Sequence, residues 1–392
     1  MALLLSAFLA GCGGGGSDAD GNVGASGTLG VSLTDAPACG FDAVNVTVSK
    51  VRVHQSDAAS ENAGGWSEIT LSPARKINLL DLTNGVLESL GETMLPAGHY
   101  TQLRLVLAAN NASSPPNNSV ILSSGTRDGE IALVTPSAVQ SGIKVNHDFD
   151  VAAGQRVDLV LDLDACKSVV KRGNGSYLLK PVVKVIPAEL NGIKGFVDPC
   201  PLGSNVMVSA QVDGTVVRST VPSTSTGEFF LARLAPDNYD AVITADGCAT
   251  AVIGTVPVES NANVVMISTD AAPIVLPASA RRNISGNVTL NPASATEEAI
   301  VVAKQTFAGG PTVTVKSQVA DLPSGDYVLT LPVGAPLLGR YVSGGTLPIP
   351  LVAQPALSGQ YTVEASATGY QTRSSGVDIS SADADRSVVL SP

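Results

Sequence analysis

The residues best suited to chemistry by type and spacing are acidic side chains near the ends of one extended segment. Asp158, Asp162 and Asp164 lie two or four positions apart, so their carboxylates point to one face of a strand. Asp35 and Asp42, in turns near the amino terminus, are the residues that would complete such a cluster. Calcium takes six to eight oxygen ligands and suits carboxylates at strand ends. No recognised calcium-binding loop frames these residues, so a solvated acidic edge is the simpler alternative.

The other chemical groups argue against catalysis. The three histidines, His54, His99 and His147, are scattered and form no His-Glu-x-x-His motif. Strand alternation would also turn His147 away from Asp148 and Asp150, which removes the nearest metal-binding set. The sequence contains neither a Gly-x-Ser-x-Gly elbow nor a phosphate-binding loop. We therefore expect a protein that is not an enzyme.

Trp66, the single tryptophan, is the candidate contact for a sugar or a partner protein. Two interpretations stay open. An exposed Trp66, coplanar with nearby tyrosines, would indicate a binding platform. Packing at the rim of a core is the alternative, and it is favoured because Ile69 and Leu71 read as a strand directly after Trp66.

The amino terminus indicates export. Residues 2–10 (ALLLSAFLA) form an apolar run that is too short to span a bilayer and is typical of a signal peptide. Leu9-Ala10-Gly11-Cys12 follows and resembles a bacterial lipobox, in which the cysteine is lipidated and becomes the mature amino terminus. An ordinary cleaved signal peptide, or a cysteine placed there by chance, is the alternative. No basic residue precedes the run, which raises the expectation of a start upstream of Met1.

We accordingly expect a signal peptide at residues 1–11, a lipidated Cys12 and a Gly/Ser tether at residues 12–26. A flexible tether of this length reaches on the order of 20 Å. In Gram-negative lipoproteins, glycines such as Gly13 and Gly14 after the lipidated cysteine imply sorting to the outer membrane. The expected location is therefore outside the cytoplasm, lipid-anchored at the bacterial outer membrane or cell surface.

Composition and periodicity predict an all-β fold. Lys and Arg total 23 against 34 Asp and Glu, and this acidity opposes binding to nucleic acid. Charged residues are few and Gly and Pro plentiful, which suits many short strands joined by turns. Apolar residues alternate at Val44/Val46/Val48, Leu103/Leu105/Leu107 and Leu159/Leu161/Leu163. The alternation changes phase after Val48, which predicts a β-bulge near Lys50, and a helical turn is expected only around residues 86–90.

A short turn followed by tyrosine recurs four times and predicts a structural device. The copies are Leu95-Pro-Ala-Gly-His-Tyr100, Leu234-Ala-Pro-Asp-Asn-Tyr239, Leu322-Pro-Ser-Gly-Asp-Tyr327 and Leu357-Ser-Gly-Gln-Tyr361. Pro and Gly favour the turn, and a tyrosine can bury its ring while its hydroxyl stays bonded. The arrangement is comparable to the tyrosine corner of β-sandwiches. Ligand stacking by these tyrosines is the less favoured alternative.

Residues 28–187 resemble the bacterial lipoprotein domain family of unknown function numbered 4382. The resemblance rests on several stretches in order, among them residues 27–37 (GTLGVSLTDAP), 41–48 (FDAVNVTV), 96–104 (PAGHYTQLR) and 161–165 (LDLDA). It implies a β-domain of a surface lipoprotein and no established activity.

Residues 192–270 resemble a carboxypeptidase regulatory-like domain, a transthyretin-type β-sandwich. The matching residues are Gly195-Phe-Val197, Thr226-Gly-Glu-Phe-Phe-Leu231, Tyr239 and Ala245-Asp-Gly247. Residues 283–391 resemble it more loosely, through Gly286-Asn-Val288 and Ala367-Thr-Gly-Tyr370. The resemblance implies accessory modules, with relatives that bind carbohydrate or form adhesin stalks, and it transfers no catalytic or zinc-binding residue.

Four cysteines remain once Cys12 is assigned to lipid, and an exported chain is expected to oxidise them. The module boundaries and strand ends favour Cys39 with Cys166 and Cys200 with Cys248, because the start of one antiparallel strand lies beside the end of its neighbour. Four free, buried thiols are the alternative.

Together these observations predict tandem antiparallel β-sandwich domains on a lipidated flexible tether. The expected domains are residues 27–187, residues 188–272 and residues 273–392. The expected function is a non-catalytic surface lipoprotein with a structural, adhesive or interaction role, anchored in the membrane by its lipid. No cofactor is expected, and a calcium ion is the alternative to that. Carbohydrate binding, with or without calcium, is the alternative function. The expected partners are a glycan or another surface protein.

Overall fold

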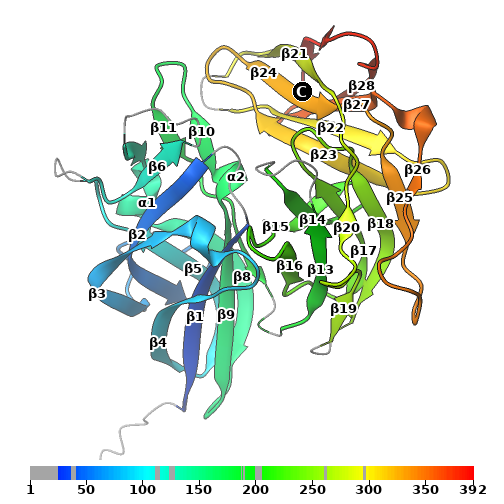
Figure 1. Cartoon of the computed structure of the whole chain (residues 1–392). Coiled ribbons are helices and arrows are strands. Elements are labelled where there is room, and N and C mark those ends of the chain that lie inside the picture. The colour runs from blue at the N-terminus through cyan, green and yellow to red at the C-terminus, as the bar shows by residue number, and fades with distance from the viewer. Residues whose placement is uncertain are drawn as a thin grey trace, which may run out of the picture.

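The computed structural model describes residues 25–36, 41–110, 115–122, 129–186, 188, 190–198, 205–259, 263–294 and 297–392. It is nearly all β, as predicted, with several sheets forming tandem sandwich-like modules. The chain forms three modules, numbered from the amino terminus. Figure 1 shows module 1 in blue to green beside module 2, which is mostly green with a later segment in orange, and most of module 3 in yellow to red. Within the described ranges, no helix is both long and apolar enough to cross a membrane.

Module 1 packs a four-stranded sheet, in the order β12-β9-β1-β4, against an eight-stranded sheet, in the order β10-β11-β7-β6-β2-β5-β8 with β3 beside β2. Its elements are β1 (Ser26–Ala36), β2 (Phe41–His54), β3 (Ser67–Asn78), η1 (Leu79–Leu82), β4 (Glu88–Pro96), β5 (Gly98–Leu107), β6 (Ser119–Leu122), β7 (Ile131–Val134), α1 (Pro136–Gln140), β8 (Ile143–Val151), β9 (Arg156–Asp164), α2 (Ala165–Ser168), β10 (Val169–Lys171), β11 (Tyr177–Leu179) and β12 (Val183–Ile186).

The alternating stripes form the core of module 1. All nine apolar residues of the three predicted stripes are buried in one cluster between the two sheets. The predicted bulge is confirmed, because the pairing of β2 with both β3 and β5 shifts register between Val48 and Lys50. The helical turn expected at residues 86–90 is wrong: β4 begins at Glu88, and helical turns occur instead in η1, α1 and α2. Pairing with β1 outweighs the weak local helical preference of that segment.

Module 2 packs a sheet of β16, β13 and β19, with β20 on β13, against a sheet in the order β15-β14-β17-β18-β25-β26. Its elements are β13 (Gly192–Asp198), β14 (Met207–Val212), β15 (Thr215–Thr220), β16 (Glu228–Ala232), β17 (Asp237–Thr244), β18 (Ala251–Val258), β19 (Val264–Met266), β20 (Ile274–Val275), β25 (Leu337–Arg340) and β26 (Val352–Ala353).

The second sheet of module 2 includes strands that lie beyond the domain boundary expected from the sequence. β25 and β26 lie within the stretch assigned to the third domain, yet they extend the sheet of module 2 through β18. Ile274 and Leu276, just past the expected boundary at residue 272, also belong to the core of module 2. A boundary drawn from a loss of strand signal cannot detect such an exchange, because a strand's partner is set by tertiary pairing.

Module 3 packs β24, β21, β29 and β30 against a sheet in the order β23-β22-β27-β28. Its elements are β21 (Arg281–Leu290), β22 (Ile300–Thr306), β23 (Thr312–Val319), β24 (Asp326–Pro332), η2 (Pro355–Leu357), β27 (Gln360–Ser366), β28 (Arg373–Asp378), β29 (Ala384–Asp385) and β30 (Val388–Leu390).

Strand pairing is antiparallel in most places but not everywhere. β1 with β9, β13 with β19, β18 with β25 and β21 with β30 are parallel. In each pair the two strands are far apart in sequence, so the intervening chain crosses the module before it returns, as parallel pairing requires. The predicted antiparallel sandwiches therefore also contain parallel strand pairs.

Candidate functional site

The most unusual chemistry in the described residues lies at the junction of modules 1 and 2. Asp162 on β9 faces Arg218 on β15, with 2.7 Å between Asp162 Oδ1 and Arg218 Nη1. Both side chains are almost fully buried, 6% and 7% exposed. Burial raises the pKa of the Asp162 carboxyl, and the nearby Arg218 guanidinium opposes that rise. A buried ion pair of this kind strongly disfavours loss of either partner, because the remaining charge would stay buried without a counter-ion.

A turn of module 1 inserts into module 2 beside this pair. The Asn84 side-chain oxygen accepts hydrogen bonds from the Thr220 hydroxyl at 2.7 Å and from the Phe230 amide at 3.0 Å. The Asn84 side-chain amide donates to the Val221 carbonyl at 2.9 Å. One side chain thus joins β16 to β15 and the residue that follows it. We call Asn84 and Gly85 the latch turn.

The local sequence explains why the latch turn fits. Asn84 and Gly85 both have positive φ, 57° and 78°, a conformation that asparagine tolerates and glycine adopts freely. A Cβ at Gly85 would lie 2.7 Å from the Ala232 Cβ, so module 2 approaches too closely for any larger residue. The Thr34 hydroxyl holds both ends of the turn through the carbonyls of Leu82 and Val86, each at 2.9 Å.

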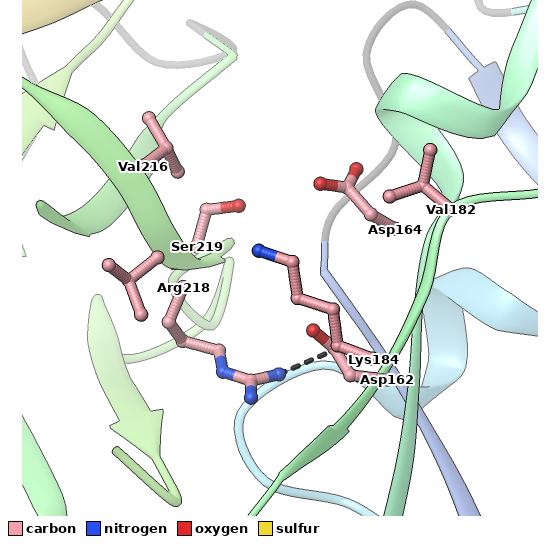
Figure 2. A pocket seen from close by; sticks show the side chains of 8 residues that line it. Asp162, Asp164, Val182, Lys184, Val216, Arg218 and Ser219 are labelled. Atoms are coloured by element: carbon pink, nitrogen blue, oxygen red, sulfur yellow. Dashed lines mark ion pairs between the residues drawn. The ribbon is translucent and has the colours of Figure 1, made fainter. Parts of the chain in front are cut away.

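Two small pockets flank Arg218. The first is lined from module 1 by Asp162, Asp164, Val182 and Lys184 and from module 2 by residues 216–219 (Figure 2). The second lies between the latch turn and Phe230. Each has free space for roughly one water molecule. The junction is therefore a closely packed interface rather than a cleft for an organic substrate.

The structure does not gather the carboxylates proposed for calcium. Asp158 pairs with Arg156 at 3.0 Å, Asp162 with Arg218, and Asp164 with Lys167 at 2.7 Å. Asp164 also caps α2 by accepting the Lys167 amide. Of the two additional carboxylates, Asp35 is buried and accepts the Ala165 amide at 3.0 Å, while Asp42 is exposed. Among the described residues no group of three or more acidic, His or Cys side chains is placed to hold a metal ion.

Trp66 is half-buried beside cationic side chains. The guanidinium carbons of Arg52 and Arg104 lie 4.5 and 5.0 Å from the centre of its ring. The His54 ring is 5.0 Å away, and the indole N–H donates to the Ser60 carbonyl at 3.0 Å. In the described part of the chain, every Trp, Tyr and Phe side chain is buried or half-buried. The coplanar exposed aromatics that would indicate a sugar platform are not found there.

The repeated tyrosines are structural. All four are buried, and each hydroxyl donates to a backbone carbonyl: Tyr100 to Pro96, Tyr239 to Ala235, Tyr327 to Arg386 and Tyr361 to Pro332. Tyr100 and Tyr239 bond four residues upstream, as in a tyrosine corner. The ligand-stacking alternative is therefore not supported.

The predicted cysteine sites are only partly visible. Cys248 is buried and disulfide-bonded. Cys12, Cys39 and Cys200 lie outside the described residues, as does the side chain of Cys166. The lipidation of Cys12 and both pairings therefore stay predictions.

Module 3 also contacts both other modules. The Gln211 side chain of module 2 accepts the Thr314 amide at 2.7 Å and donates to the Thr314 carbonyl at 2.8 Å. Lys180 of module 1 lies 3.3 Å from Glu298, whose pKa is raised by burial. The three modules therefore form one assembly in which each touches the other two.

Sequence reasoning missed both Asn84 and Arg218. The Asn-Gly pair at residues 84–85 is a turn signal that could have been noticed, although it does not reveal what the turn contacts. No sequence pattern around Arg218 indicates that it is buried, since a single arginine in a strand is ordinarily solvated.

No curated protein matches the chain. A type II cohesin–X-dockerin complex from Acetivibrio cellulolyticus is 22% identical over 23% of this chain and 58% of its own, with a TM-score of 0.19. The Bacillus anthracis TIE protein is 11% identical over 94% of this chain and 50% of its own, with a TM-score of 0.19. A streptococcal ancillary pilin is 12% identical over 93% of this chain and 98% of its own, with a TM-score of 0.18.

The matches cover 58% and 50% of the length of the first two structures, and TM-scores this low carry no information on function. The match to a family model is more specific. Residues 26–181 match the family described as a domain of unknown function (DUF4382), so module 1 is a domain of that family.

Proposed function

We propose that this chain is a non-catalytic surface lipoprotein, a structural module that presents a fixed protein surface to another surface protein. The observation that carries the proposal is the buried Asp162–Arg218 pair between modules 1 and 2. The two charges of this buried pair can contact each other in only one relative orientation of the modules. Such a pair therefore favours a fixed arrangement over independent movement of the modules. A rigid assembly is what a display or spacer role requires.

The position of the chain ends supports this role. In Figure 1, β1 begins at the bottom of module 1 and the carboxyl terminus lies at the top, on module 3. A lipid attached ahead of β1 would leave module 3 as the part farther from the membrane. In the proposal Cys12 carries that lipid, the chain is exported to the outer membrane or cell surface, and modules 2 and 3 are accessory domains of the regulatory-like kind.

Glycan binding is the less supported role. The ring of Trp66 lies beside two guanidinium groups and a histidine, which leaves little of the aromatic face for a sugar. No feature of the described residues favours calcium-dependent binding over the protein-interaction role.

The rigidity of the assembly is tested by small-angle X-ray scattering of residues 25–392. A single compact particle is expected, and its scattering curve should match the curve calculated from the structure shown in Figure 1. The Arg218→Ala variant should show a larger radius of gyration. Arg156→Ala is the matched control, since Arg156 pairs with Asp158 and Glu92 on the surface of module 1 alone. A wild-type profile of freely jointed modules would overturn the proposal.

The surface role is tested on intact cells. Proximity labelling from the carboxyl terminus should capture the same protein partner repeatedly, and mass spectrometry should find Cys12 acylated. Soluble, unmodified protein would remove the anchor from the proposal. Binding to a glycan array without any protein partner would favour the carbohydrate role instead.

A further inference from the structure

The loop between β2 and β3, residues 55–66, folds back over the outer face of the eight-stranded sheet. Its carbonyls accept hydrogen bonds from side chains of that sheet. Gln102 on β5 donates to Ser56 and Asp57 at 2.9 and 2.8 Å, and Arg104 donates to Ala59 at 2.8 Å. Under this cover Gln102 and Arg104 are buried, although both are strongly polar. The loop is therefore held in place mainly by hydrogen bonds.

His54, at the end of β2, is bound to both ends of this loop. Its Nδ1 accepts the backbone N–H of Ser56 at 2.8 Å, and its Nε2 lies 3.0 Å from the Gly64 carbonyl. The Ser56 amide can only donate, so Nδ1 carries no proton and Nε2 donates to Gly64. The bond from Ser56 therefore requires the neutral imidazole, whereas the bond to Gly64 does not.

Several charged side chains lie around His54 and the loop. Arg52 from β2 and Arg104 from β5 both lie over Trp66, whose ring is next to His54. Lys144 from β8 reaches the Asp57 carbonyl at 2.6 Å. The nearby negative charge from β3 is Glu68, which is already bound to Arg52 at 2.7 Å and Lys50 at 3.1 Å. Asp57 and Glu61 in the loop itself are exposed to solvent.

We propose that residues 55–66 form an acid-released cover: protonation of His54 frees the loop, which uncovers Gln102 and Arg104 and exposes Trp66, the last residue of the loop. A proton on Nδ1 would place N–H against the N–H of Ser56 and remove that hydrogen bond. It would also add a positive charge beside two arginines. Release would therefore follow acidification of the medium. The inference is independent of the proposed function.

Trp66 makes the release measurable, because it is the single tryptophan of the chain. Between pH 7.5 and pH 5 we expect its emission maximum to shift to longer wavelength and its quenching by acrylamide to increase. The His54→Gln variant should lose this transition, since glutamine can both donate and accept but does not titrate. His147→Gln is the matched control, because His147 lies on β8 and bonds to neither end of the loop; it should keep the wild-type transition.

Protonated histidine can itself quench a nearby indole, so hydrogen exchange provides the second measurement on the wild-type protein. Protection of the Ser56 amide should fall about tenfold over the same pH range, after correction for the intrinsic exchange rate. Exchange within β2 and β5 should stay unchanged. Unaltered protection in residues 55–66, or an identical transition in His54→Gln, would overturn the proposal.

Discussion

The junctions on the two sides of module 2 are built differently. Toward module 1, module 2 is held by side chains: the buried Asp162–Arg218 pair and the latch turn. Toward module 3, it is held by backbone, because β25 and β26 come from the chain beyond β24 and complete its sheet. A junction made of side chains can be opened by one substitution, whereas a junction made of a shared sheet cannot. A single substitution should therefore reduce the rigidity of the assembly most at the junction of modules 1 and 2.

The largest effect is expected from removing one partner of the buried pair. Arg218→Met should destabilise the junction of modules 1 and 2 by about 3–5 kcal/mol, because Asp162 would stay buried and unpaired. Chemical denaturation of residues 25–392 measures the loss. Combining Arg218→Met with Asp162→Leu should recover most of it, since no buried charge remains. A double variant as unstable as Arg218→Met would contradict this account.

The matched control for that change is Arg156→Met. Arg156 is 55% exposed and its partners are on the surface, so the loss should be much smaller than that of Arg218→Met. Equal effects at Arg156 and Arg218 would show that burial of the pair is not what matters.

A smaller effect is expected at the latch turn. Asn84→Ala removes the acceptor of the Phe230 amide and of the Thr220 hydroxyl, and should cost about 1–3 kcal/mol. Asn238→Ala, on the exposed side of β17, should stay within about 0.5 kcal/mol. Thermal unfolding of both variants side by side tests the difference.

At the junction of modules 2 and 3, a substitution should lower stability without separating the two modules. Gln211 is fully buried and holds Thr314, so Gln211→Ala should lower stability by about 1–2 kcal/mol. Scattering should still show modules 2 and 3 together, because the pairing of β18 with β25 is unaffected. Separation of the two modules in this variant would mean that the shared sheet does not hold them.

The smallest effect is the pH dependence of the Asp162 junction. The pKa of Asp162 is raised in the folded state, so the folded state binds a proton more tightly than the unfolded state does. The contribution of Asp162 to stability is therefore greatest in acid and declines as pH rises through its folded-state pKa. Stability measured from pH 3 to pH 7, minus that of Asp162→Asn, should fall with pH. A rising difference would mean that pairing with Arg218 outweighs burial.

The sequence predicted the parts of this protein that depend on local repetition. Alternating apolar residues identified the core stripes, and a change of phase located the bulge at Lys50. The turns that precede Tyr100 and Tyr239 indicated buried, bonded tyrosines. These features follow from backbone geometry and burial within one strand or turn, which a single stretch of sequence contains.

The contacts that these strands and turns make with distant parts of the chain were decided by the tertiary structure alone. Alternation placed Asp162 on an outward face of β9, but it cannot distinguish a face in water from a face against another module. Arg52 and Arg104 lie over Trp66 because β2 and β5 pair in one particular register, which the sequence does not state. The exchange of β25 into module 2 has the same origin. Contacts between segments far apart in the chain depend on the packing of the whole molecule, and local sequence patterns do not encode that packing.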